Sequence, residues 1–145
     1  MPLRAEGLKA LTQEERGVLL NGIAGCYSML GDPANAFAYM YQALRESSPT
    51  RNNGFDMVLY CNLSHELLSL GDYEEGLRYV QEGIERCSQL NNPGLMGVLL
   101  LNRMTCLTDL DRAGEALADV YRLLAIPADA GGRGAANPSF ELMAL

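Results

Sequence analysis

The segment Leu70-Gly71-Asp72-Tyr73-Glu74-Glu75-Gly76-Leu77 decides the fold that we expect for this chain of 145 residues. A related segment begins 40 residues earlier, at Leu30, and another begins 40 residues later, at Leu110. Recurrence at a fixed period of about 20 to 50 residues is typical of stacked repeat proteins. The three segments therefore predict three structural units of the same kind.

The apolar residues around the three segments follow the same period. Six of the seven columns that we compared are apolar in every repeat, and the exception is the column that contains Arg103. Neighbouring positions on each side of a segment are three or four residues apart, which is the spacing of one helix face. The columns are Leu20/Tyr60/Leu100, Ile23/Leu63/Arg103, Tyr27/Leu67/Leu107, Leu30/Leu70/Leu110, Phe37/Leu77/Leu117, Met40/Val80/Val120 and Leu44/Ile84/Leu124.

Local signals place helix ends on both sides of these segments. Thr12 with Glu15, and Asp72 with Glu75, have the spacing of a capping box at the start of a helix. Gly71 can adopt the left-handed conformation that often ends a helix. Six helices and no strand are therefore predicted, over 13–30, 33–46, 53–70, 73–90, 95–109 and 112–125.

Composition excludes several classes of protein. Hydrophobic residues make up 48% of the chain and charged residues 20%, as in ordinary folded proteins. The chain has no apolar run of about eighteen residues and no secretory signal at its start, so we expect a cytoplasmic protein without a membrane partner. The net charge of −7 disfavours nucleic acid as a partner. The four cysteines lack a C-x-x-C pair, and we expect them to be buried free thiols.

Small residues recur where the two helices of each pair would cross, and Gly71-Asp72-Tyr73-Glu74-Glu75 forms the turn between two helices. These features resemble the tetratricopeptide repeat (TPR) over about 13–125, with a period of 40 residues instead of the usual value of about 34. The resemblance implies an all-α fold, a right-handed TPR-like superhelix (α-solenoid) of three antiparallel helix pairs. The forty-residue repeat is similar to the long-period repeats of bacterial regulatory proteins. The third repeat departs from the pattern at Arg103, Met104 and Leu123. The small-residue columns are Ala24/Ser64/Met104, Ala36/Gly76/Ala116 and Ala43/Gly83/Leu123.

The same pattern predicts how the chain is divided. Residues 1–12 form an N-terminal lead, and 13–126 hold the three repeats, at about 13–46, 53–90 and 95–125. We expect a flexible linker over 127–138 and the start of a further helix, or a cap, over 139–145.

The TPR resemblance also implies a concave groove that the first helix of each pair lines. A carboxylate would be buried there without a cation, so we exclude the acidic peptide tails that some TPR proteins hold. The residues that we expect to line the groove are apolar or neutral: Asn21, Val58, Cys61, Asn62, His65, Val98, Leu101, Asn102 and Thr105.

Four of these residues need separate interpretation. Asn62 and Asn102 share one column, and either they form a ladder that binds the backbone of a peptide, or each satisfies a neighbouring helix or faces solvent. His65 is the single histidine, which could sense pH or contact a ligand, but a packing or surface role is the one expected. Cys61 precedes it by one helical turn, but no third group orients the pair, so we expect no catalytic, cofactor or metal site.

We therefore expect a protein-interaction or regulatory module, not an enzyme, that binds a peptide or helix of another protein. The apolar segment 139–145 favours an N-terminal fragment of a larger bacterial protein, and a homodimer through the C-terminal end is an alternative. Two other functions stay open. One is the sensor domain of a signalling enzyme such as a diguanylate cyclase, and the other is a small TPR-type chaperone for secreted proteins.

Overall fold

The computed structural model describes residue 7 and residues 10–46 and 54–126, which form six long helices and no strand. The predicted helix boundaries agree with the structure to within two residues. The predictions for the remainder of the lead, for the linker 127–138 and for 139–145 concern residues outside the described ones. The helices are α2 (Gln13–Met29), α3 (Pro33–Glu46), α4 (Phe55–Leu70), α5 (Tyr73–Leu90), α6 (Pro93–Asp109) and α7 (Ala113–Leu124).

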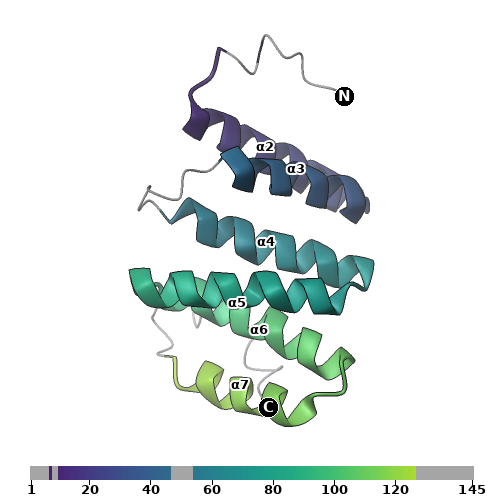
Figure 1. Ribbon diagram of the computed structural model, residues 1–145, viewed down its shortest axis with the longest axis vertical. Coiled ribbons are helices and arrows are strands. Elements are labelled where there is room, and N and C mark those ends of the chain that lie inside the picture. The colour runs from purple at the N-terminus through teal and green to yellow at the C-terminus, as the bar shows by residue number, and fades with distance from the viewer. Residues whose placement is uncertain (1–6, 8–9, 47–53, 127–145) are drawn as a thin grey trace.

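The helices stack in chain order along the long axis of the molecule, with α2 and α3 at one end and α7 at the other (Figure 1). Each helix packs against the next one, and α4 also packs against α6. Turns of two or three residues join the helices of each pair, and connections this short leave the two helices antiparallel. The described chain is therefore an all-α solenoid of three helix pairs, as the sequence predicts.

Capping groups fix the helix ends where the sequence places them. The amide of Glu15 donates to Thr12 Oγ1 at 3.1 Å, and the amide of Thr12 donates to Glu15 Oε2 at 2.8 Å, which completes the predicted capping box. Gly71 has φ 77° and ends α4, as expected. In the third turn Asp111 replaces this glycine and is held at φ 59°, a conformation that few non-glycine residues adopt.

Small residues let the helices approach closely. A Cβ atom on Gly83 of α5 would lie 2.8 Å from Leu99 Cδ2 and 3.0 Å from Tyr60 Cβ. Ala36 and Ala43 of α3 are completely buried. Since these positions belong to the predicted small-residue columns, the close crossings follow the forty-residue period.

The expectation for the cysteines is confirmed for three residues and wrong for one. Cys61, Cys87 and Cys106 are buried free thiols, whereas Cys26 is exposed. Cys26 lies on α2, the first long helix of the described stack, and among the described helices none precedes α2 to cover it.

Candidate interaction groove

Hydrogen bonds join the first helices of the three pairs through asparagine side chains. Asn62 Nδ2 of α4 donates to Asn21 Oδ1 of α2 at 3.2 Å. Asn102 Nδ2 of α6 donates to the carbonyl of Cys61 at 3.2 Å and to Ser64 Oγ at 2.9 Å. The column of Asn62 and Asn102 thus connects α2, α4 and α6 into one row.

Most of the side chains that we expect in the groove reach the surface of this row. Cys61 is the exception, because it is 5% exposed and lies beneath the surface. His65, Val98 and Thr105 are exposed. The half-buried members are Asn21, Val58, Asn62, Leu101 and Asn102. The part of these residues in binding stays a prediction.

The surroundings of Asn102 fix the orientation of its amide. A backbone carbonyl only accepts, so the atom that faces the carbonyl of Cys61 is the Nδ2 donor. Ser64 Oγ donates to the same carbonyl at 2.8 Å and therefore accepts from Asn102. Within the described residues, Asn102 Oδ1 makes no hydrogen bond, which leaves one acceptor at the row of first helices.

The electrostatics of Cys61 oppose nucleophilic chemistry. Burial, and secondarily the neighbouring Cys87 thiol, raise the pKa of Cys61 to about 12. A reactive cysteine needs a lowered pKa, because the thiolate is the nucleophile. His65, one turn later, is exposed, so the two side chains do not share a buried environment.

The described residues also contain neither a metal-binding cluster nor a helix that could span a membrane. Within 10–46 and 54–126, no three His, Cys, Asp or Glu side chains gather closely enough to hold a metal ion. No helix of the described chain has the length and hydropathy that crossing a bilayer requires.

Sequence reasoning missed two surface hollows. One has a volume of about 350 Å³ and lies against α3, α4 and α5, where Tyr41, Arg45, Tyr60 and Arg78 contribute to its lining. Tyr79 lies at its base, with the Arg78 guanidinium carbon 4.4 Å from the centroid of its ring. No sequence motif indicates this hollow, because its lining comes from three helices that meet only in the fold.

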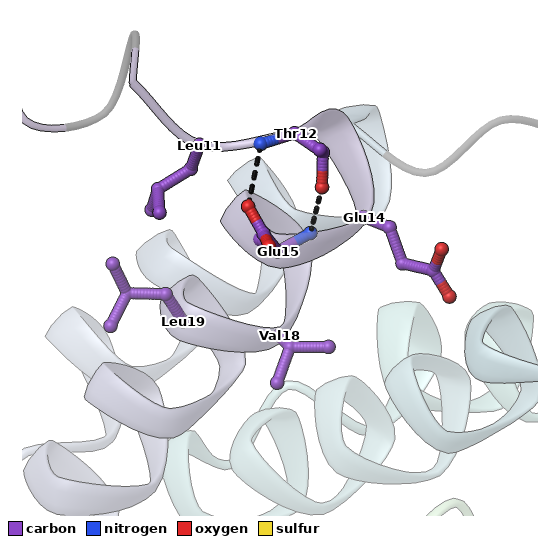
Figure 2. A pocket seen from close by; sticks show the side chains of 6 residues that line it. All are labelled: Leu11, Thr12, Glu14, Glu15, Val18 and Leu19. Atoms are coloured by element: carbon purple, nitrogen blue, oxygen red, sulfur yellow. Dashed lines mark hydrogen bonds between the residues drawn. The ribbon is translucent and has the colours of Figure 1, made fainter.

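The other hollow, which we call the α2 hollow, has a volume of about 530 Å³ at the start of the stack. Figure 2 shows Leu11 and Leu19 on one side and Glu14 on the other, with the capping pair Thr12 and Glu15 in the middle. The residues that line it are Leu11, Thr12, Glu14, Glu15, Val18 and Leu19.

The fold and this row of helices define an all-α helical repeat protein. No protein-family model matches the chain, and no curated protein matches it. The chain is similar in structure to a TPR-like protein from Chlorobium tepidum TLS, with a TM-score of 0.74 and 19% sequence identity. The match covers 91% of this chain and 89% of that chain. This similarity confirms the predicted TPR-like fold, while membership of the TPR family and of its long-period type stays a prediction.

Proposed function

We propose that this chain is a protein-interaction module that binds a neutral or basic peptide, in extended or helical form, along the row formed by α2, α4 and α6. The TPR-like fold supports a protein-interaction role in general. The peptide would contact the apolar side chains of Val58, Val98 and Leu101, and its backbone N–H groups would donate to asparagine oxygens. Because the predicted lining holds no lysine or arginine, an acidic peptide would lose solvation there without compensation.

The observation that carries this proposal is the fixed amide of Asn102. Its Nδ2 is held by the neighbouring helix, and its Oδ1 is without a hydrogen bond in the described part of the chain. An amide that is already held in place loses little side-chain entropy when it accepts from a peptide. In this proposal the donor of Asn102 satisfies a neighbouring helix, and its acceptor would bind the ligand.

A selection from a displayed library of random peptides tests the proposal. Peptides that bind the wild-type chain should bind Val98→Lys and Thr105→Arg at least about tenfold more weakly, which corresponds to about 1.4 kcal/mol. Gln42→Arg, on the exposed side of α3, is the matched control and should bind like wild type. Equal binding by all four proteins, or the recovery of no peptide, contradicts the proposal.

The cellular location of the module and the kind of protein to which it belongs are also proposals. Four free cysteines agree with a cytoplasmic location, where thiols stay reduced. The sensor domain, the chaperone, the fragment of a larger bacterial protein and the homodimer through the C-terminal end remain alternatives, since no contact in the described residues favours one of them. A ligand-dependent enzyme activity in the intact gene product would support the sensor domain.

A further inference from the structure

The outer face of α2 matches the faces that α4 and α6 bury inside the molecule. Leu59 and Leu99 are 0% exposed, whereas Leu19, their equivalent in the first repeat, is 38% exposed. Leu59 packs with Ala43 and Leu44 of α3, and Leu99 packs with Cys87 and Ile84 of α5. Successive pairs meet where α3 packs on α4 and where α5 packs on α6, and we call each of these contacts an internal joint. At both internal joints, this leucine is covered by the second helix of the preceding pair. The described chain holds no such helix before α2.

The column that contains Cys26 shows the same difference in exposure between the first repeat and the other two. Glu66 and Cys106 are buried in the second and third repeats, whereas Cys26 is exposed in the first. A Cβ atom on Gly22, one turn earlier, would meet nothing within 4 Å. The outer face of α2 thus combines an apolar residue with small residues that allow another helix to approach closely.

The outer face of α7 is the counterpart at the other end of the stack. Leu117 and Leu124 are 53% and 56% exposed. Leu44 and Ile84, the equivalents of Leu124, are half-buried against the first helix of the following pair. The described chain provides no following helix for α7. The two ends of the stack therefore expose the two kinds of face that pack together inside the molecule, where α3 meets α4 and α5 meets α6.

The details of the internal joint identify where the two ends would meet. Leu44 and Phe55 belong to the same cluster as Leu59. By the forty-residue period, Leu124 of another copy would take the place of Leu44, beside Glu15 and Leu19. The α2 hollow lies at these positions and would receive the leucine side chain (Figure 2).

Charge also favours this arrangement. The first turn of α2 carries Glu14 and Glu15, and the last turn of α7 carries Arg122. The antiparallel joint brings these two helix ends together, so opposite charges would be neighbours.

We propose that a second copy of this chain docks head to tail, with the outer face of α7 in one copy covering the outer face of α2 in the next. The contact continues the solenoid across the chain boundary by the same joint that links its internal pairs. It is heterologous, so it leaves one free end on each side and permits further growth, unlike a two-fold dimer. This inference is independent of peptide binding in the groove.

Sedimentation velocity of the full chain over a wide concentration range tests the proposal. The wild-type sedimentation coefficient should rise with concentration beyond the value of a dimer. Leu19→Glu blocks the α2 face and Leu117→Glu/Leu124→Glu blocks the α7 face, so each variant alone should stay monomeric. Ser88→Glu, on the exposed side of α5, is the control and should assemble like wild type. Circular dichroism checks that every variant is folded.

Mixing the two blocked variants gives the decisive measurement. Each retains the face that the other has lost, so the mixture should form a one-to-one dimer that does not grow. A wild-type chain that stays monomeric overturns the proposal. So does dimerisation by Leu19→Glu alone, which would indicate a two-fold contact through α7. Failure of the folded variants to combine also overturns it.

Discussion

Arg103 Nη1 lies 2.7 Å from both carboxylate oxygens of Asp119, whose side chain is 1% exposed. Arg103 Nε also donates to Gln81 Oε1 at 2.7 Å, so one side chain joins α5, α6 and α7. In the second repeat the equivalent positions hold Leu63 and Tyr79, which pack in one apolar cluster. The third repeat has exchanged an apolar contact for an ion pair at the same crossing, which explains the exception in the apolar column.

Breaking this ion pair should destabilise the chain more than replacing both partners. Arg103→Leu leaves the carboxylate of Asp119 buried beside only the more distant Arg122, at 3.7 Å. We expect the free energy of unfolding in urea to fall by about 3 kcal/mol. Arg103→Leu/Asp119→Tyr restores the residue types of the second repeat and should recover most of this loss. A double variant as unstable as the single one would contradict the equivalence of the two crossings.

The close approach of α5 and α6 should make Gly83 intolerant of a methyl group. Gly83→Ala places a Cβ atom 2.8 Å from Leu99 Cδ2 and 3.0 Å from Tyr60 Cβ, so these packed neighbours must shift. We expect a loss of about 1 to 3 kcal/mol in the free energy of unfolding. Gly114→Ala is the control, because nothing lies within 4 Å of its added Cβ atom, and its stability should not fall. Equal effects of both substitutions on the urea midpoint would argue against the tight crossing.

The buried thiols should weaken the fold at alkaline pH. Burial raises the pKa of Cys61 to about 12 and that of Cys87 and Cys106 to about 11, above the usual thiol value of about 8.5. The unfolded chain therefore loses these protons at a lower pH than the folded chain. Stability that is complete below about pH 8.5 should be lost as the pH rises towards 11 or 12.

A comparison between two cysteine variants isolates this effect. Cys61→Ala removes one buried thiol, so its urea midpoint should fall less steeply than that of wild type between pH 8 and pH 10. The difference in slope should correspond to the contribution of one titrating group. Cys26→Ala removes an exposed thiol and should keep the wild-type dependence. Identical slopes for all three proteins would show that Cys61 does not contribute to the alkaline loss.

The asparagine column should contribute to both stability and binding. Asn62→Ala/Asn102→Ala removes the three bonds to Asn21, Cys61 and Ser64, which are worth about 3 kcal/mol together by the usual net value of about 1 kcal/mol for a neutral hydrogen bond. Urea unfolding should show this loss, and the affinity for a selected peptide should fall in the folded double variant. Gln42→Ala, exposed on α3, should change neither quantity. Unchanged peptide affinity in a destabilised double variant would leave the asparagines a structural role only.

The sequence by itself determined the number of helices, their boundaries and their pairing. These features depend on interactions between residues that are close in the sequence. They are the three- and four-residue spacing of apolar positions, the Thr12–Glu15 capping box and the glycine at position 71. The forty-residue period added the pairing, because short turns leave successive helices antiparallel.

Only the tertiary structure decided what depends on partners far apart in the chain. Asp119 is the partner of Arg103 across a helix crossing, and Asn102 is oriented by a carbonyl 41 residues away. The exposure of Cys26 depends on its place at the end of the stack and not on its apolar sequence neighbours. Periodicity shows which face of a helix is apolar, but only the packed stack determines whether another helix covers that face.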